Sequence, residues 1–90
     1  EGLFKVRLAR LTERQRSYAR AMAAFSAEPI NSSDVANALG LSLSQAAPIR
    51  DELIKKGMAY SPERGLIGFT VPKFADYMRR IVPTDARKKR

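Results

Sequence analysis

The chain has 90 residues, 44% of them hydrophobic, and its 17 Lys and Arg against nine Asp and Glu give a formal net charge of +8. This length predicts one small folded domain, and the basic balance favours a polyanionic partner. The chain has no cysteine or histidine, which excludes disulfides, thiolate metal sites and the common catalytic pairs built on histidine. It also shows no glycine-rich phosphate loop, membrane span or signal peptide. We therefore expect a cytoplasmic, non-catalytic module without a cofactor, a metal or a membrane partner.

The excess positive charge lies at the two ends of the chain. Residues 1–20 and residues 76–90 each hold six basic and two acidic side chains, a net charge of +4 for each stretch. Residues 21–75 hold five of each sign and are neutral. A polyanion would therefore meet the flanks more strongly than the middle of the domain. The alternative is a soluble domain with a basic surface and no such partner.

The first third of the chain predicts an arm, a helix and a short strand. Residues 3–11 partly alternate apolar and basic side chains, which indicates a short strand or an arm lying on the domain. Thr12 and Gln15 have the spacing of a capping box, and apolar residues at helical spacing then predict a helix over residues 13–26. Ile30, after a proline, is expected to form a strand of one or two residues.

Two short helices joined by a turn should follow. Ser32 is the expected N-cap of the first, and Gly40 is its expected left-handed stop. The second should begin at Ser42 or Ser44, with Gln45 completing a capping box from Ser42, and should end at Gly57. The side chains expected to face the core from this pair are Val35, Ala38, Leu39, Ile49, Leu53 and Ile54.

Residues 58–71 predict a β-hairpin around the turn "SPERG", followed by a last helix that ends before Pro83. Tyr60 and Phe69 alternate with small residues in this hairpin, so we interpret them as core rather than as a stacking platform. The resulting fold class is mainly α with a small β-hairpin. It corresponds to a winged helix-turn-helix of three core helices, a two-stranded wing and a C-terminal helix. The expected divisions are residues 1–11 for the arm, 12–82 for the domain and 83–90 for a basic tail.

Three stretches carry a resemblance to a known family: "LTERQRSYARAMA", "SSDVANALG" and "APIRDELIKKGMAYSPERGLIGFTVPKF". Over residues 4–80 the chain resembles the C-terminal winged-helix region of bacterial AAA-type ATP-binding proteins, most specifically in "RDELIKKGMAYSPERG" and "FTVPKF". The resemblance implies an ATPase module upstream in the same polypeptide, using ATP and Mg²⁺, and a start at Glu1 rather than Met fits a fragment. The nucleotide-binding motifs of such ATPases are absent here, so we expect this fragment to bind and hydrolyse no ATP.

Double-stranded DNA is the leading candidate partner. Ser44 and Gln45, at the start of the second helix of the pair, could reach base edges. Arg64, at the tip of the predicted wing, could enter a minor groove or could be an ordinary solvated charge. Asp51 and Glu52 on the outward face would repel phosphates, so a structural or protein-docking helix is the alternative. The remaining basic candidates are Lys55, Arg79, Arg80, Arg87, Lys88, Lys89 and Arg90.

Arg50 falls near the buried edge of the same helix. It could form a structural ion pair, with Asp34 as the best-placed carboxylate, or it could clamp a phosphate. The function inferred from sequence is a non-catalytic winged-helix module of an AAA-type ATPase that binds double-stranded DNA. One alternative is a protein-interaction or regulatory domain that packs on the ATPase module or on a partner subunit. The other is the DNA-binding core of a transcription regulator.

Overall fold

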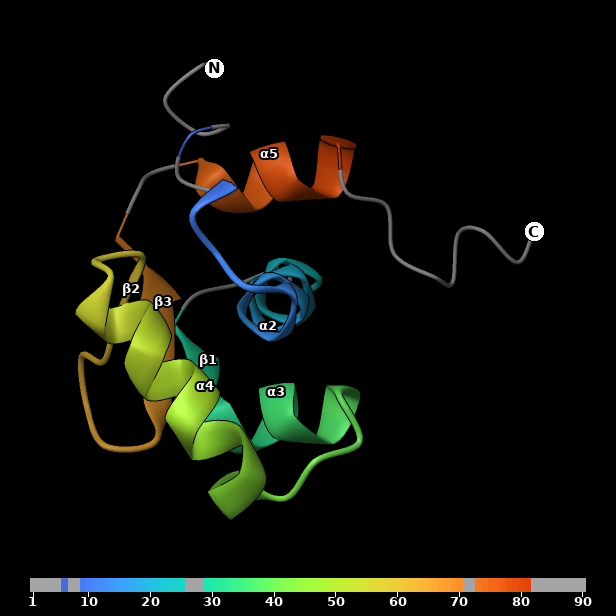
Figure 1. Cartoon of the computed structure of the whole chain (residues 1–90). Coiled ribbons are helices and arrows are strands. Elements are labelled where there is room, and N and C mark those ends of the chain that lie inside the picture. Colours follow the sequence, from blue (N-terminus) through green and yellow to red (C-terminus); the bar gives the residue numbers. More distant parts are fainter. Residues whose placement is uncertain (1–5, 7–8, 26–28, 71–72, 82–90) are drawn as a thin grey trace.

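The computed structural model describes residues 6, 9–25, 29–70 and 73–81. Figure 1 shows the elements with described bounds, which follow one another along the chain as α2 (Glu13–Ala23), β1 (Ile30–Asn31), α3 (Ser32–Ala38), α4 (Leu43–Lys55), β2 (Ala59–Tyr60), β3 (Leu66–Phe69) and α5 (Phe74–Ile81). The predicted fold class, mainly α with a small β part, is confirmed. Most of the predicted arm, the strand end at Val71, the helix stop at Pro83 and the basic tail lie outside the described residues.

Both predicted capping boxes are present. In α2, the Gln15 N–H donates to Thr12 Oγ1 at 3.2 Å, and the Thr12 N–H donates back to Gln15 Oε1 at 3.1 Å. In α4, the corresponding distances between Ser42 and Gln45 are 3.1 and 2.9 Å. Each box satisfies two backbone donors that a helix N-terminus leaves without intrahelical partners.

The start of α3 differs from the prediction. The N-cap is Asn31, which makes no side-chain cap bond, and Ser32 is the first helical residue and is buried. The Ser32 N–H donates to the Gly65 carbonyl at 2.8 Å, so this end of the helix is held against the β2–β3 turn. With the helix held in this rotation, Ala36 is buried and Ala38, which we predicted to face the core, is exposed.

The three strands form one antiparallel sheet in the order β1-β3-β2, so the strand predicted at Ile30 joins the hairpin as a third member. Phe69 is buried in β3 as predicted, but Tyr60 is 47% exposed, and its assignment to the core is wrong. The reason is that Met58 belongs to the exit from α4, where its N–H donates to the Leu53 carbonyl at 3.0 Å. Ala59 then takes the inward position of β2, and Tyr60 on this edge strand faces outward.

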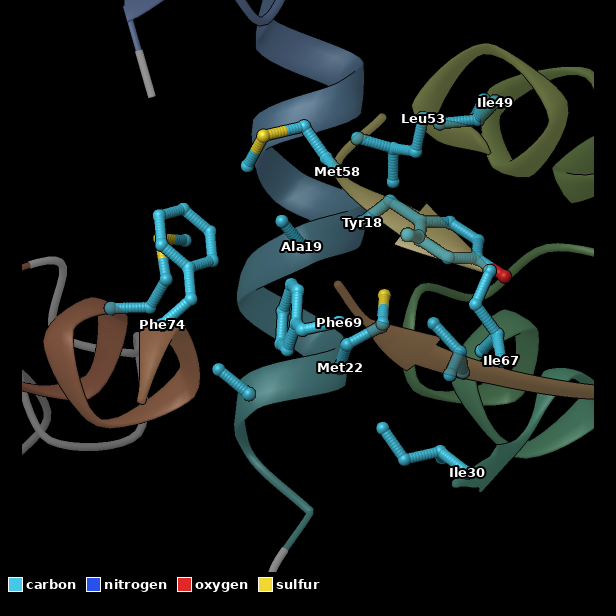
Figure 2. Packing of buried hydrophobic residues seen from close by; sticks show 14 of the residues in the cluster. Tyr18, Ala19, Met22, Ile30, Ile49, Leu53, Met58, Ile67, Phe69 and Phe74 are labelled. Carbon is cyan, nitrogen blue, oxygen red and sulfur yellow. The ribbon is translucent and has the colours of Figure 1, made fainter. Parts of the chain in front are cut away.

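Helix α2 is the centre of the packing, with α5 on one side and α3 and α4 on the other (Figure 1). The fully buried large side chains come from all of these elements and from the sheet (Figure 2). Phe74 of α5 packs edge-to-face on Phe69 of β3, with ring centroids 5.2 Å apart. These side chains form a single cluster around α2, which includes Tyr18, Met22, Val35, Leu53, Ile67, Phe74 and Met78.

The C-terminal end of α4 is hydrogen-bonded to the start of α2. Gly57, the predicted end of this helix, has a left-handed φ of +77°, and Gly40 after α3 has the predicted left-handed conformation with a φ of +73°. Before that stop, Lys56 Nζ donates to the Arg10 carbonyl at 2.8 Å and to Gln15 Oε1 at 2.7 Å.

No helix among the described residues has the length and apolar character needed to cross a membrane.

Candidate nucleic-acid interface

The first two turns of α4 form a ridge between two hollows. One hollow, which we call the turn-side hollow, has a volume of about 410 Å³ and lies between α4, the start of α3 and the β2–β3 turn. The other, the α2-side hollow, has a volume of about 440 Å³ and lies between α4 and α2. The ridge therefore stands out from the surface along the end of α4 from which recognition helices commonly contact bases.

Ser44 and Gln45 lie on opposite sides of this ridge. Ser44 lines the turn-side hollow and Gln45 lines the α2-side hollow, and both are exposed. Gln45 Oε1 already accepts the Ser42 N–H at 2.9 Å, so the amide NH₂ is the group left for a ligand. The ridge thus presents a hydroxyl on one side and an amide donor on the other.

Arg64 lies in the β2–β3 turn and lines the turn-side hollow, as Ser44 does. It is exposed and forms no hydrogen bond or ion pair with the residues that the structure describes. The turn places it there because Gly65 adopts a φ of +82°, a conformation that glycine accepts without strain. Arg64 therefore remains the candidate cation of this turn.

Arg14 is a candidate that the sequence did not single out. It lines the α2-side hollow together with Gln45, is exposed, and makes no ion pair or hydrogen bond within the described part of the chain. Glu13 lines the same hollow and offsets part of its charge. In the sequence, Arg14 was one of six basic residues in an N-terminal flank, and only the packing of α2 on α4 places it beside the ridge.

Arg50 pairs with Asp51 and not with the predicted Asp34. Its Nη1 lies 3.3 Å from Asp51 Oδ1, and its Nε donates to Ser32 Oγ at 3.2 Å. The buried Ser32 takes the place at the start of α3 that a carboxylate partner would need, and Asp34 is exposed. Because the Asp51 side chain is 63% exposed, the pair is weak, but it reduces the negative charge on the outward face.

Tyr18 of α2 also lines the turn-side hollow, although its ring is completely buried. Burial raises the pKa of its hydroxyl above the usual value of about 10, and the nearby Arg50 guanidinium and Ser32 hydroxyl oppose that rise. The Ser32 hydroxyl already accepts the Arg50 Nε–H. No hydrogen bond of standard geometry reaches the Tyr18 hydroxyl from the described residues.

A family model described as Domain of unknown function (DUF8462) matches residues 1–78. The chain belongs to this family. No curated protein and no solved structure matches the chain. The residues of the ridge, of both hollows and of the turn that carries Arg64 all lie within the matched range.

None of the remaining basic candidates that the structure describes lies at the ridge. Arg79, beyond the end of the DUF8462 match, donates from Nη1 to the Ala23 carbonyl and from Nη2 to Asp76 Oδ1 at 2.7 Å. It therefore satisfies a carbonyl at the C-terminal end of α2, and its role as a DNA contact stays a prediction. Arg80 is exposed on α5, which lies across α2 from α4 (Figure 1). Lys55 is exposed at the far end of α4, and Arg87, Lys88, Lys89 and Arg90 lie outside the described residues.

Proposed function

We propose that this DUF8462 domain is a non-catalytic winged-helix module that binds double-stranded DNA through the first turns of α4. The observation that carries the proposal is the ridge with an exposed arginine on each side, Arg14 from α2 and Arg64 from the β2–β3 turn, neither of which has an ion-pair partner among the described residues. The order of helices α2, α3 and α4 followed by the β2–β3 hairpin fits a winged helix, with β1 as the third strand of the sheet.

In this arrangement the ridge enters the major groove. The Ser44 hydroxyl and the Gln45 amide reach base edges, while Arg14 and Arg64 bind phosphates on the two sides of the groove. The N-terminus of α4 adds the positive end of the helix dipole, which attracts phosphate.

The acidic residues of α4 do not exclude this mode of binding. Asp51 lies seven positions after Ser44, roughly 10 Å along the axis at about 1.5 Å per residue. Only the N-terminal end of the helix needs to approach the bases, so Asp51 and Glu52 would lie toward the outside of the groove. They would limit how deeply α4 inserts and would favour a tilted approach.

The proposed context is an AAA-type ATPase module in the same polypeptide, with the ATP and Mg²⁺ sites on that module. Its support is the sequence resemblance in the stretch from Arg50 to Phe74. In this context the domain attaches the ATPase to DNA and performs no chemistry itself.

Fluorescence anisotropy with a labelled duplex at several salt concentrations tests the proposal. Each phosphate contact contributes a slope of about −0.9 in log K against log salt, so Arg64→Ala should weaken binding and flatten the slope by about 1. Arg14→Ala should act in the same direction but less, because Glu13 already offsets its charge. Lys55→Ala removes the same charge from the far end of α4 and is the matched control. An equal effect of Lys55→Ala would mean diffuse binding rather than binding by the ridge.

Gln45→Glu gives a second, sharper variant. Glutamate at this position preserves the capping box with Ser42, so the stability should stay within about 0.5 kcal/mol of the parent. It replaces a donor by a negative charge on the α2 side of the ridge, so DNA binding should fall more than in Lys55→Ala. If the intact domain shows no binding even at low salt, the DNA proposal is lost.

Docking on protein is the second candidate, and one observation favours it. Leu43 at the tip of the ridge is 56% exposed, and Asp51 and Glu52 are exposed on the same helix. An apolar and acidic surface of this kind fits the ATPase module or a partner subunit. Size-exclusion chromatography of the domain with the separately expressed upstream module tests this, and Leu43→Ser should reduce any complex without changing the melting temperature.

A further inference from the structure

The floor of the turn-side hollow contains polar groups for which the described residues provide no hydrogen-bond partner. Buried polar groups in folded proteins are nearly always hydrogen-bonded. The Tyr18 side chain is 0% exposed, and its hydroxyl has no hydrogen-bond partner among the described residues. In Figure 2 the oxygen of Tyr18 points away from Ala19 and Met22, on the far side of the ring from the centre of the cluster. A buried donor is thus left over at the floor of the hollow.

Arg50 supplies a second unused donor at the same place. Its side chain is 21% exposed, its Nε donates to Ser32 Oγ, and its Nη1 donates to Asp51 Oδ1, which leaves Nη2 without a partner among the described residues. On the rim, Arg64 is unpaired within the described part of the chain. Because Asp51 offsets one of the two guanidinium charges, the hollow carries a net charge close to +1.

One wall of the hollow is apolar, and the volume of about 410 Å³ leaves room for a small ring. Ala46 and Ala47 of α4 line one side with single methyl groups, and the exposed Leu43 extends that side at the tip of the ridge. A ligand complementary to this hollow has one negative charge at one end and a planar apolar group at the other.

We propose that the turn-side hollow binds a small aromatic carboxylate, with its carboxylate at Tyr18 Oη and Arg50 Nη2 and its ring against Ala46 and Ala47. Arg64 lies over the open side and contributes its charge. Ser44 and Arg64 are also the contacts that we assign to DNA, so this ligand would compete with DNA for the ridge. That competition rests on the proposed function, whereas binding of the carboxylate does not.

Inorganic phosphate or a DNA phosphate fits the hollow less well. A phosphate has no apolar group to cover the alanine methyls, and a phosphodiester within a duplex cannot leave its backbone to reach the buried Tyr18 hydroxyl. A monoanion also matches a net charge close to +1 better than a phosphate dianion does.

The test is an NMR titration of the whole chain with benzoate, followed through the backbone amide signals of Ser32, Ala47, Arg50 and Gly65. We expect saturable shifts at these amides with benzoate and none with the neutral isostere benzamide. Tyr18→Phe should weaken benzoate binding by about tenfold, as expected for a lost hydrogen bond to a charged group, while Tyr60→Phe should not change it. Ala47→Leu fills the hollow from an exposed helical position and should abolish binding without lowering the melting temperature.

Three results would overturn the proposal. One is the absence of saturable shifts with benzoate. Another is equal benzoate affinity in the parent and in both the Tyr18→Phe and Ala47→Leu variants; if Tyr18→Phe does not fold, Ala47→Leu decides alone. The third is inorganic phosphate saturating the same amides as tightly as benzoate, which would assign the hollow to phosphate. Failure of the DNA proposal leaves all of these readouts intact, because no DNA is present in the titration.

Discussion

The two sides of α2 differ in how completely their polar groups are satisfied. On the α5 side, Phe74 and Met78 are fully buried, and Arg79 donates to the Ala23 carbonyl and to a carboxylate on its own helix. On the α4 side, the Tyr18 hydroxyl has no partner, and Arg64 is unpaired, within the described residues. Arg79 and Arg64 therefore have different roles, although both are basic residues in the sequence. Arg79 satisfies a carbonyl at the end of α2, and Arg64 is available to a ligand.

The largest expected effect on stability concerns the side of α2 that packs against α5. Phe74→Ala removes a fully buried ring that packs on Phe69, and it should lower the free energy of unfolding by about 3–5 kcal/mol. Leu43→Ala, on the α4 side, removes a side chain that is 56% exposed and should change the free energy of unfolding by less than about 0.5 kcal/mol. Chemical denaturation of both variants measures this difference. Similar losses of stability in the two variants would show that Leu43 is part of the core.

Arg79→Ala tests the carbonyl contact at the end of α2. We expect it to lower the free energy of unfolding by about 1–2 kcal/mol, because the Ala23 carbonyl loses a charged donor. Arg64→Ala removes the same charge and should leave the melting curve unchanged. Thermal denaturation followed by circular dichroism compares the two. A larger destabilisation from Arg64→Ala would contradict the distinction drawn between these arginines.

Tyr18→Phe tests the unsatisfied hydroxyl. It keeps the buried ring and removes a polar group without a partner, so the free energy of unfolding at neutral pH should rise by about 1 kcal/mol. A loss of similar size would mean that the hydroxyl is bonded to Ser32 after all, and that the hollow lacks a free donor at its floor.

Tyr18→Phe should also change how the stability of the domain depends on pH. Burial raises the pKa of Tyr18 above about 10 in the folded state, so the folded chain resists ionisation that the unfolded chain undergoes at its ordinary pKa. The stability linked to this group is fully present below pH 10 and is lost as the pH rises through the folded pKa. Urea unfolding below and above pH 10 should show a steeper alkaline loss for the parent than for Tyr18→Phe. Parallel losses would refute the shift.

The smallest expected effect compares the two capping boxes. Gln45 is exposed and its carbonyl oxygen accepts one donor, so Gln45→Ala should lower the free energy of unfolding by about 0.5 kcal/mol. Gln15 is buried and its carbonyl oxygen accepts both the Thr12 N–H and Lys56 Nζ, so Gln15→Ala should have the larger effect. Denaturation of the two variants side by side measures the difference, and equal effects would show that the Lys56 contact adds no stability.

The sequence predicted the features that are decided locally. Thr12 with Gln15 and Ser42 with Gln45 mark the helix starts, because a cap needs only residues three positions apart. Gly40 and Gly57 mark stops, because their positive φ is a property of single residues. Leu53 was assigned to the core from helical periodicity, and it is buried.

The errors and omissions concern features that depend on distant parts of the chain. Ser32 was predicted as an N-cap, but its N–H donates to the carbonyl of Gly65 in the hairpin turn. Arg50 was predicted to pair with Asp34, but it donates to the Ser32 hydroxyl and pairs with Asp51. Arg14 and Tyr18 reach the site only through the packing of α2 on α4. A pattern within one helix could show that they point outward or inward, but it could not show which helix they would meet.

Lys56 gives the domain a mechanical connection between its first helix and its candidate reading helix. One ammonium group joins the Arg10 carbonyl, the side chain that caps α2 and the last turn of α4. A force applied to the backbone near Arg10 would therefore act on the end of α4 without passing through the hydrophobic core. Because α4 is 13 residues long, about 20 Å at about 1.5 Å per residue, a small tilt at that end would displace the ridge at the opposite end.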